Sequence, residues 1–309
     1  LALSKKNEAF SLQVLCSFTW AREIQKELIY LVAFNIFLSI TAVLGNILIL
    51  VALRRVSSLH PPSKLLFRCL ATTDLCVGLI TEPLSVVYWM SLAYERRNLC
   101  RYSYISFFIV SYTLCSVSLL TMSAIGVDRL LALLLRLRYR QVVTLMRTYL
   151  IVVIVWIMSA VASISFIGNH LVTIWYGYLV IPLCLVISIA SYTKIFLKLR
   201  HHQKQVQGHV QQEQPSQPAP LNIQRYRKAV SSALWVQRTL VACYLPYGIV
   251  RALFSYGKSS SSSFLILGLE MSLIYLNSTL NPFLYCWKIS EVKQAVKETI
   301  REALCCLSC

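Results

Sequence analysis

Charged residues are scarce in this chain. They make up 14% of its 309 residues, whereas soluble globular proteins carry about 25%. Hydrophobic residues make up 57%, and the mean hydropathy is +0.63. The 11 cysteines are too few for a fold built on disulfides. These proportions exclude a disordered chain and disfavour an ordinary soluble enzyme.

Acidic residues are fewer than basic ones: the chain has 12 Asp and Glu against 30 Lys and Arg, so the net charge is +18. Basic charge of this size also occurs in nucleic-acid-binding proteins. In a chain this apolar, it indicates basic loops at the cytoplasmic surface of a membrane instead. We therefore expect a membrane protein with no nucleic-acid partner.

The chain contains seven long apolar runs separated by short polar or basic joints. The runs lie at about 28–53, 65–90, 102–135, 148–168, 172–199, 229–254 and 264–287. A bilayer core is crossed by about 20 apolar helical residues, whereas barrel strands need only about ten. The pattern predicts an all-α membrane protein, a seven-transmembrane-helix bundle at 28–287 with an N-terminal segment at 1–27.

Basic residues predict the orientation of the bundle. Most of the 30 Lys and Arg lie in the joints on the side of the C-terminus, which should therefore be cytoplasmic. We expect a multi-pass protein of the plasma membrane with its N-terminus extracellular. The Gln- and Pro-rich stretch 201–224 should be a disordered cytoplasmic loop. The second outer loop, at about 168–174, is short and has no cysteine.

Polar side chains recur inside the apolar runs, where a charge costs several kcal/mol and therefore indicates function. The members of this polar set are Asn46, Asp74, Ser118, Asn277 and Asn281. One interpretation is a hydrogen-bonded network that only holds the helices together. The other is the same network with a bound Na⁺, because oxygen ligands suit a hard cation.

Two further features point to movement at the inner end. Asp128 and Arg129 end the third run, where the acid can hold the arginine sideways until it is released. The alternative is an interfacial arginine whose head group extends to the lipid surface. Pro246 and Pro282 should kink their helices, either as pivots or as static bends.

The motifs occur in an order that resembles class A (rhodopsin-like) G protein-coupled receptors over nearly the whole chain. They are Gly45-Asn46, Leu70-Ala71 with Asp74, Asp128-Arg129-Leu130, Trp156, Cys243-Tyr244-Leu245-Pro246 and Asn281-Pro282-Phe283-Leu284-Tyr285. The resemblance, loosely nearest the adenosine and melanocortin receptors, implies a ligand-driven outward swing of helix 6 and no covalent catalysis. It implies a heterotrimeric G protein and arrestin as partners, and no cofactor beyond an allosteric Na⁺. By the resemblance, Asp74, Ser118, Asn277 and Asn281 match the family's sodium pocket. Arg129, Tyr192 and Tyr285 match the residues that rearrange when the G protein enters.

The chain also departs from the family pattern. Tyr244 replaces the usual tryptophan and Leu130 the usual tyrosine. The usual disulfide to the second outer loop cannot form, so Cys16 and Cys100 either bridge each other or remain two thiols. Basic residues replace the acid at the foot of helix 6, which predicts raised agonist-free activity.

The ligand is less constrained. Ser111 stands where amine receptors carry an aspartate, and Tyr275 stands where opsins carry the retinal lysine. We expect an extracellular small molecule or peptide, cationic or zwitterionic, bound near two unusual acids. The predicted contacts are Glu82, Ser111, Tyr112, Tyr244, Tyr247, Arg251, Glu270 and Tyr275. The alternative is that Arg251 and Glu270 form a structural ion pair.

The C-terminal segment 288–309 combines an amphipathic pattern with cysteines. Apolar residues recur every three or four positions over 288–304, accompanied by lysines, which predicts a helix on the inner leaflet. Cys305, Cys306 and Cys309 follow, and are expected either to carry palmitate in the membrane lipid or to stay reduced. Two other functions remain open: a seven-helix transporter using Asp74 and Glu82, and a non-signalling decoy.

Overall fold

Helices account for all the regular secondary structure in the described part of this computed structural model. The described residues are 16, 18–56, 59–135, 138–210, 238–250, 261–288 and 290–307. Within them, six helical segments are long and apolar enough to cross a membrane. A further helix, at 238–250, occupies the sixth place in the chain order. The fold is a seven-helix bundle, as predicted.

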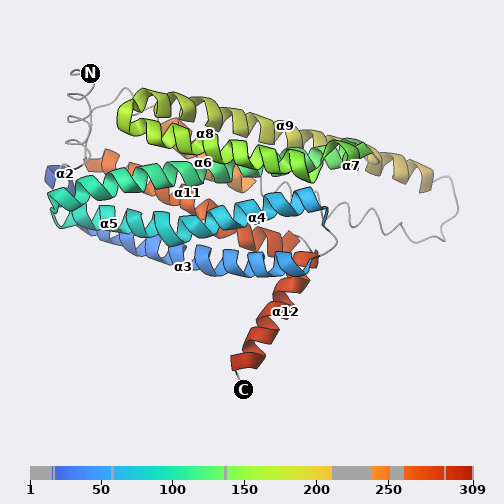
Figure 1. Ribbon diagram of the computed structural model, residues 1–309, viewed down its shortest axis with the longest axis horizontal. Coiled ribbons are helices and arrows are strands. Elements are labelled where there is room, and N and C mark those ends of the chain that lie inside the picture. The colour runs from blue at the N-terminus through green and yellow to red at the C-terminus, as the bar shows by residue number, and fades with distance from the viewer. Residues whose placement is uncertain are drawn as a thin grey trace.

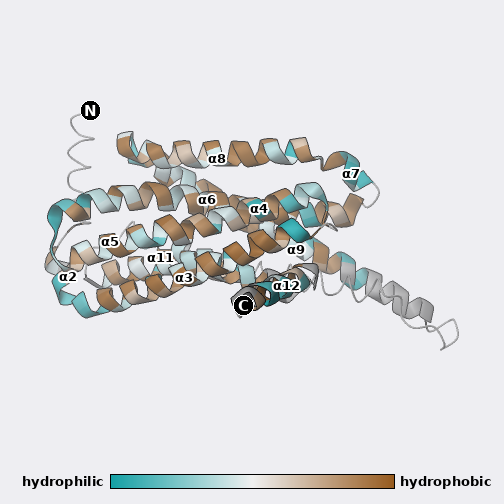
Figure 2. Cartoon of the chain, turned by 60° about the horizontal axis from the view of Figure 1, so that its bottom comes forward, coloured by the Kyte–Doolittle hydropathy of each residue, from teal (hydrophilic) through white to brown (hydrophobic). Residues whose placement is uncertain are grey.

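The bundle has seven helices, and those that Figure 1 labels run side by side along the long axis of the molecule. In order they are α3 (Gln25–Arg55), α4 (Pro61–Cys76) with η1 (Val77–Thr81) and α5 (Glu82–Ala93), α6 (Arg97–Leu135), α8 (Leu145–Gly168), α9 (His170–Val210), the helix 238–250, and α11 (Ser261–Lys288). Hydrophobic colour prevails along α3, α6 and α8, and hydrophilic colour gathers at α7 (Tyr139–Val142) (Figure 2). Below, the outer end is the one where α8 meets α9, and the inner end is the one that carries Arg129.

The second crossing is not one regular α-helix. Five residues, Val77–Thr81, form a π-helical turn between α4 and α5. Pro83 has no N–H to continue a regular ladder, and π-helical turns occur mostly as single-turn bulges inside α-helices, as here. Helix α3 passes close to this turn, since a Cβ at Gly78 would lie 3.0 Å from Val43 Cγ2. Ser39 Oγ donates a 2.7 Å hydrogen bond to the carbonyl of Gly78, which joins α3 to the turn.

Several helix boundaries differ from the prediction. Helix α9 continues to Val210, so the first ten residues of the predicted loop 201–224 are helical. Gln, Lys and His are compatible with a helix, and the first proline of that stretch comes only at position 215. The remainder, 211–224, lies outside the described residues. The second outer loop is shorter than predicted, because only Asn169 separates α8 from α9.

The two ends of the chain also carry helices of their own. A short helix, α2 (Phe18–Glu23), lies within the predicted segment 1–27 and precedes α3 directly. At the inner end, α12 (Ser290–Leu307) leaves the bundle at an angle (Figure 1). Its Val292 and Val296 are buried, whereas Lys293 and Lys297 are exposed. The helix is therefore amphipathic, and it includes Cys305 and Cys306 rather than ending before them.

Candidate functional site

A buried carboxylate, Asp74 of α4, is the centre of the polar set. Ser118 Oγ and Ser278 Oγ donate to its Oδ1 over 3.0 and 2.8 Å, and Asn281 Nδ2 donates to its Oδ2 over 2.7 Å. The four residues come from α4, α6 and α11, and all are buried. The carboxylate thus ties three helices together at mid-bundle. Ser278 was missed by the sequence analysis, although it lies three residues before Asn281 and so on the same helix face.

The two remaining asparagines of the predicted set lie around this centre without touching the carboxylate. Asn46 Nδ2 donates to the carbonyls of Ala42 and Ser278, over 2.8 and 3.2 Å. Asn277 Nδ2 donates to the sulfur of Met122 over 3.3 Å. The structure therefore brings the whole set into one region, but Asn46 and Asn277 belong to its second layer.

Three amide oxygens in this region are left without a donor. Asn46 Oδ1, Asn277 Oδ1 and Asn281 Oδ1 are buried and have no hydrogen-bond partner among the described residues. Buried oxygens of this kind ordinarily have a partner in the protein, in water or in an ion. Amide oxygens in the neighbourhood of a carboxylate are ligands that suit a hard monovalent cation, so the chemistry of the residues present fits Na⁺.

At the inner end, Asp128 and Arg129 are neighbours on α6. Arg129 Nε is 3.8 Å from Asp128 Oδ2, and its guanidinium lies over the ring of Phe67, 5.5 Å from the centroid. Arg129 Nη2 is buried and has no hydrogen-bond partner in the part of the chain that the structure describes. The arginine is therefore held sideways against α4 by a neighbouring acid and an aromatic face.

Two residues that the sequence analysis missed hold Asp128 in place. Ser63 Oγ donates to Asp128 Oδ2 over 2.8 Å, and the Tyr139 hydroxyl of α7 donates to Oδ1 over 2.6 Å. Burial, and then the bond to Asp128, raise the pKa of Tyr139 to about 12. The hydroxyl consequently stays protonated at physiological pH and remains a donor. No spacing in the sequence marked Tyr139, because it lies on a separate short helix.

The other predicted switch residues are placed as follows. Tyr192 of α9 is buried, and its ring packs on Gly126, where a Cβ would come within 3.3 Å of it. Pro246 lies inside the helix 238–250, and Pro282 lies inside α11. The backbone of Tyr285 is helical, but its side chain lies outside the described part of the structure. Tyr192 is therefore within one helix turn of Arg129 along α6.

Two adjoining cavities open in the outer half of the bundle. The small cavity, of about 60 Å³, is lined from α6, α9, the helix 238–250 and α11. The large cavity, of about 630 Å³, is lined from α6, α8, α9 and the helix 238–250. Both contain Tyr112, Tyr244 and Tyr247 in their walls. The volume of the large cavity is typical of a small-molecule site.

The predicted ligand contacts divide between these cavities and the surrounding core. Ser111 lines the small cavity, and its hydroxyl is 2.9 Å from that of Tyr275, which is fully buried. Glu82 and Glu270 are also buried, and line neither cavity. Both carboxylate oxygens of Glu82 lack a hydrogen-bond partner among the described residues. Arg251 lies outside those residues, so its pairing with Glu270 stays a prediction.

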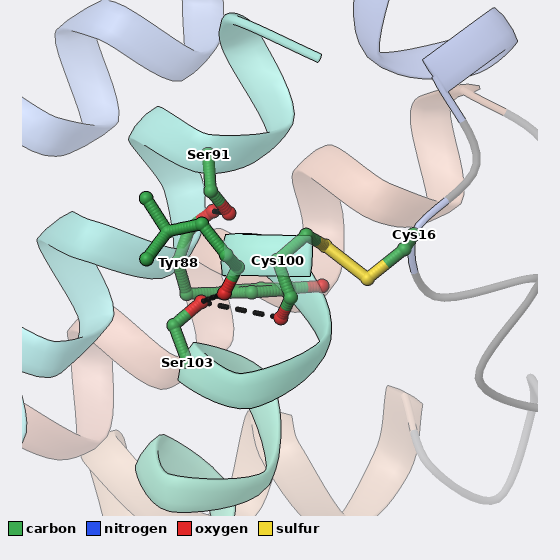
Figure 3. The surroundings of a disulfide bond; sticks show 6 residues. Cys16, Tyr88, Ser91, Cys100 and Ser103 are labelled. Atoms are coloured by element: carbon green, nitrogen blue, oxygen red, sulfur yellow. Dashed lines mark hydrogen bonds between the residues drawn. A yellow bond between two sulfur atoms is a disulfide. The ribbon is translucent and has the colours of Figure 1, made fainter. Parts of the chain in front are cut away.

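The cysteines of the outer end are joined. Cys16 and Cys100 form a disulfide, with the Cys100 sulfur at the start of α6 (Figure 3). Nearby, Ser103 Oγ donates to the carbonyls of Leu99 and Cys100, over 2.6 and 3.2 Å. The bridge fastens the segment before α2 to the outer end of the third crossing. Of the predicted tail cysteines, Cys305 is exposed and not in a disulfide, the Cys306 side chain is not described, and Cys309 lies outside the described residues.

Replacing Cys16 by Ser should lower the stability of the protein. The bridge closes a sequence separation of 84 residues, for which loop entropy sets an upper limit of about 5 kcal/mol. Unfolding temperature in detergent should fall for Cys16→Ser and Cys100→Ser, and should hold for Cys305→Ser. In the wild type, peptides with residues 16 and 100 should be alkylated only after reduction; alkylation without reductant would contradict the bridge.

Comparisons with known proteins agree with this geometry. A model described as "7 transmembrane receptor (rhodopsin family)" matches residues 45–173 and 167–285. The chain is 24% identical to the adenosine receptor A2a of Canis lupus familiaris over 299 residues, which covers 85% of this chain and 70% of that receptor. It is 23% identical to the adenosine receptor A3 of Ovis aries, covering 88% and 90%. It is 26% identical to the human histamine H2 receptor, covering 80% and 73%.

Proposed function

Because this chain belongs to the rhodopsin family of seven-transmembrane receptors, we propose that it binds an extracellular ligand in the two adjoining cavities and activates a heterotrimeric G protein at its inner end. By family it is a multi-pass membrane protein and a G protein-coupled receptor, not an enzyme. Its relatives include adenosine receptors. The observation that carries the proposal is the restrained Arg129, held by Asp128 and lying over Phe67.

In the proposed mechanism, ligand binding shifts the balance between two arrangements of the bundle. The ligand contacts Ser111, Tyr112, Tyr244 and Tyr247, whose helices meet at the cavities. Tyr244 donates a 3.3 Å hydrogen bond to the carbonyl of Cys115, so a ligand that displaces it loosens the helix 238–250 from α6. That helix swings outward about Pro246, and Arg129 leaves Asp128 to meet the G protein. Tyr192, Pro282 and Tyr285 complete the rearrangement.

The polar set is proposed to hold Na⁺ in the inactive arrangement. Asp74 and Ser118 would supply charge and a hydroxyl, and Asn46, Asn277 and Asn281 would supply amide oxygens. When bound, the cation screens the buried carboxylate. The residues themselves fasten α4, α6 and α11 to one another, so the same network resists the helix movement.

The remaining partners are proposed from the placement of the two ends. The N-terminus and the Cys16–Cys100 bridge face outward at the plasma membrane, and Arg129 and α12 face the cytoplasm, as the distribution of Lys and Arg favours. Arrestin meets the same inner end as the G protein. Palmitate on Cys305, Cys306 and Cys309 anchors α12 in the lipid. The cationic or zwitterionic ligand predicted from the sequence would have to reach Glu82 and Glu270, which line neither cavity, so the cavities favour a different class of ligand.

Replacing Arg129 by Ala should abolish G protein output. The side chain is partly exposed, and its contacts to Asp128 and Phe67 restrain it without forming part of the buried core, so the bundle should persist. Agonist-free activation is measured in cells across the main Gα classes, at matched surface expression. Arg147→Ala, an exposed arginine near the same end, is the control. If the wild type gives a signal and both Arg129→Ala and Arg147→Ala give the same signal, the proposal is contradicted.

A further inference from the structure

The large cavity differs from the small one in the helices that surround it. Its walls come from α6, α8, α9 and the helix 238–250. The described parts of α4, α5 and α11 contribute nothing to it. It therefore lies to one side of the bundle, between the third, fourth, fifth and sixth crossings.

The large cavity is continuous with the outer surface of the bundle. Four of its lining residues are between 43% and 51% exposed: Ile174 and Tyr178 of α9, and Leu245 and Ile249 of the helix 238–250. Exposed apolar side chains on the outer wall of a transmembrane bundle face lipid rather than water. A Cβ at Gly248, which also lines the cavity, would meet nothing within 4 Å. The wall between α9 and the helix 238–250 is thus open toward the bilayer.

The large cavity carries no charge. Its described lining contains no Lys, Arg, His, Asp or Glu, and aromatic rings such as Phe108 and Phe166 form much of the wall. The ring centroids of these two phenylalanines are 4.1 Å apart. An ammonium or carboxylate taken into such a site would lose its hydration without gaining a counter-charge, which is costly.

Two tyrosine hydroxyls of the wall donate to backbone carbonyls. Tyr112 donates to the carbonyl of Thr173 over 2.7 Å, and Tyr244 donates to the carbonyl of Cys115 over 3.3 Å. A hydroxyl oxygen that donates its hydrogen can still accept another hydrogen bond. These tyrosines are therefore suited to accept from a hydroxyl or amide N–H of a ligand.

We propose that the ligand is an uncharged amphiphile, an apolar chain with a hydroxyl or amide head group, which enters the large cavity from the bilayer between α9 and the helix 238–250. This inference rests on the receptor function proposed above and adds the class of ligand and its route. The chain lies against Phe108 and Phe166, and the head group reaches Tyr112 and Tyr244.

Photolabelling of the whole receptor in lipid nanodiscs tests the class of ligand. Three photoreactive, alkyne-tagged probes share one long acyl chain and differ only in the head: a monoacylglycerol, a fatty acid and a fatty amine. The monoacylglycerol probe should label peptides from 173–185 and 244–249 about tenfold more than the amine probe, because an unpaired buried charge costs at least about 1.4 kcal/mol. Unlabelled monoacylglycerol should compete. Equal labelling by all three probes, or labelling that does not saturate, would overturn the proposal.

Two glycine variants test the route. Gly248→Phe places a ring in the open space of the cavity wall and should reduce monoacylglycerol labelling at least several-fold. Gly168→Phe is the matched control, because a Cβ there also meets nothing within 4 Å and Gly168 lies outside the cavity lining. Labelling that survives in Gly248→Phe overturns the route. If that variant does not fold, the labelled positions in the wild type decide the route: label on 173–185 and 244–249 supports it, and label elsewhere overturns it. Labelling needs no G protein. If the cavity is labelled as expected but no G protein responds, the proposed receptor function fails and the ligand proposal stands.

Discussion

Replacing Asp128 by Asn should raise agonist-free G protein activation about five- to thirtyfold. The change removes the negative charge that faces Arg129 Nε at 3.8 Å and weakens the hydrogen bonds from Ser63 and Tyr139. Arg129 is partly exposed, so its ion pair contributes less than about 1 kcal/mol. With the two weakened hydrogen bonds, the inactive arrangement loses about 1–2 kcal/mol, which sets the expected ratio. Agonist-free nucleotide exchange on the coupled Gα at matched expression is the measurement.

Matched tyrosine variants separate this effect from general loosening. Tyr139→Phe removes one hydrogen bond to Asp128 and keeps the ring, so it should give a smaller rise than Asp128→Asn. Tyr149→Phe changes an exposed tyrosine of α8 and should leave the basal signal unchanged. A basal signal in Asp128→Asn equal to that of the wild type would show that Asp128 does not restrain Arg129.

Replacing Asp74 by Ala should lower the stability of the bundle strongly. Three buried donors, on Ser118, Ser278 and Asn281, would lose their acceptor. Each unsatisfied donor costs about 1 kcal/mol or more, so the total is about 3 kcal/mol or more. The unfolding temperature in detergent should fall accordingly. Ser278→Ala removes one donor and should cost less, and Thr72→Ala, on the exposed face of α4, should cost little.

Sodium should stabilise the wild type and not the Asp74→Ala variant. A ligand that binds only the folded state raises stability with its concentration. The unfolding temperature is therefore compared in NaCl and in choline chloride at equal ionic strength. If NaCl raises the unfolding temperature of both proteins equally, the ion acts away from Asp74. If NaCl does not raise that of the wild type, the sodium proposal is wrong, and the hydrogen-bond network is unaffected by that result.

The sequence predicted the fold and the centre of the polar set for clear physical reasons. An ionisable residue such as Asp74 in an apolar run is rare enough to be noticed. Its partners Ser118 and Asn281 lie at positions that the resemblance to the family also marked. Ser278 escaped because a serine in an apolar helix is common, and only packing shows that its hydroxyl, rather than the Asn277 amide, meets the carboxylate.

The helix ends and the cavities were harder to predict. Apolar runs fade gradually, so they did not show that α8 and α9 are separated by Asn169 alone or that α9 continues to Val210. The charged residues Glu82 and Glu270 drew the ligand prediction because they stand out in apolar runs. A cavity with an uncharged wall gives no such signal, since it depends on which faces of four helices meet. Gly248 of that wall has open space beside it, but a glycine alone predicts nothing.

Guanine-nucleotide exchange on purified heterotrimeric G proteins, catalysed by the receptor in lipid nanodiscs, tests the central claim most directly. Wild type, Asp128→Asn and Arg129→Ala are compared with empty nanodiscs. The Asp128→Asn variant is included because it should activate the G protein without a ligand. The account predicts that Asp128→Asn exceeds the wild type for at least one Gα class, and that Arg129→Ala falls to the rate of empty nanodiscs. Equal rates for all three proteins in every Gα class would contradict it.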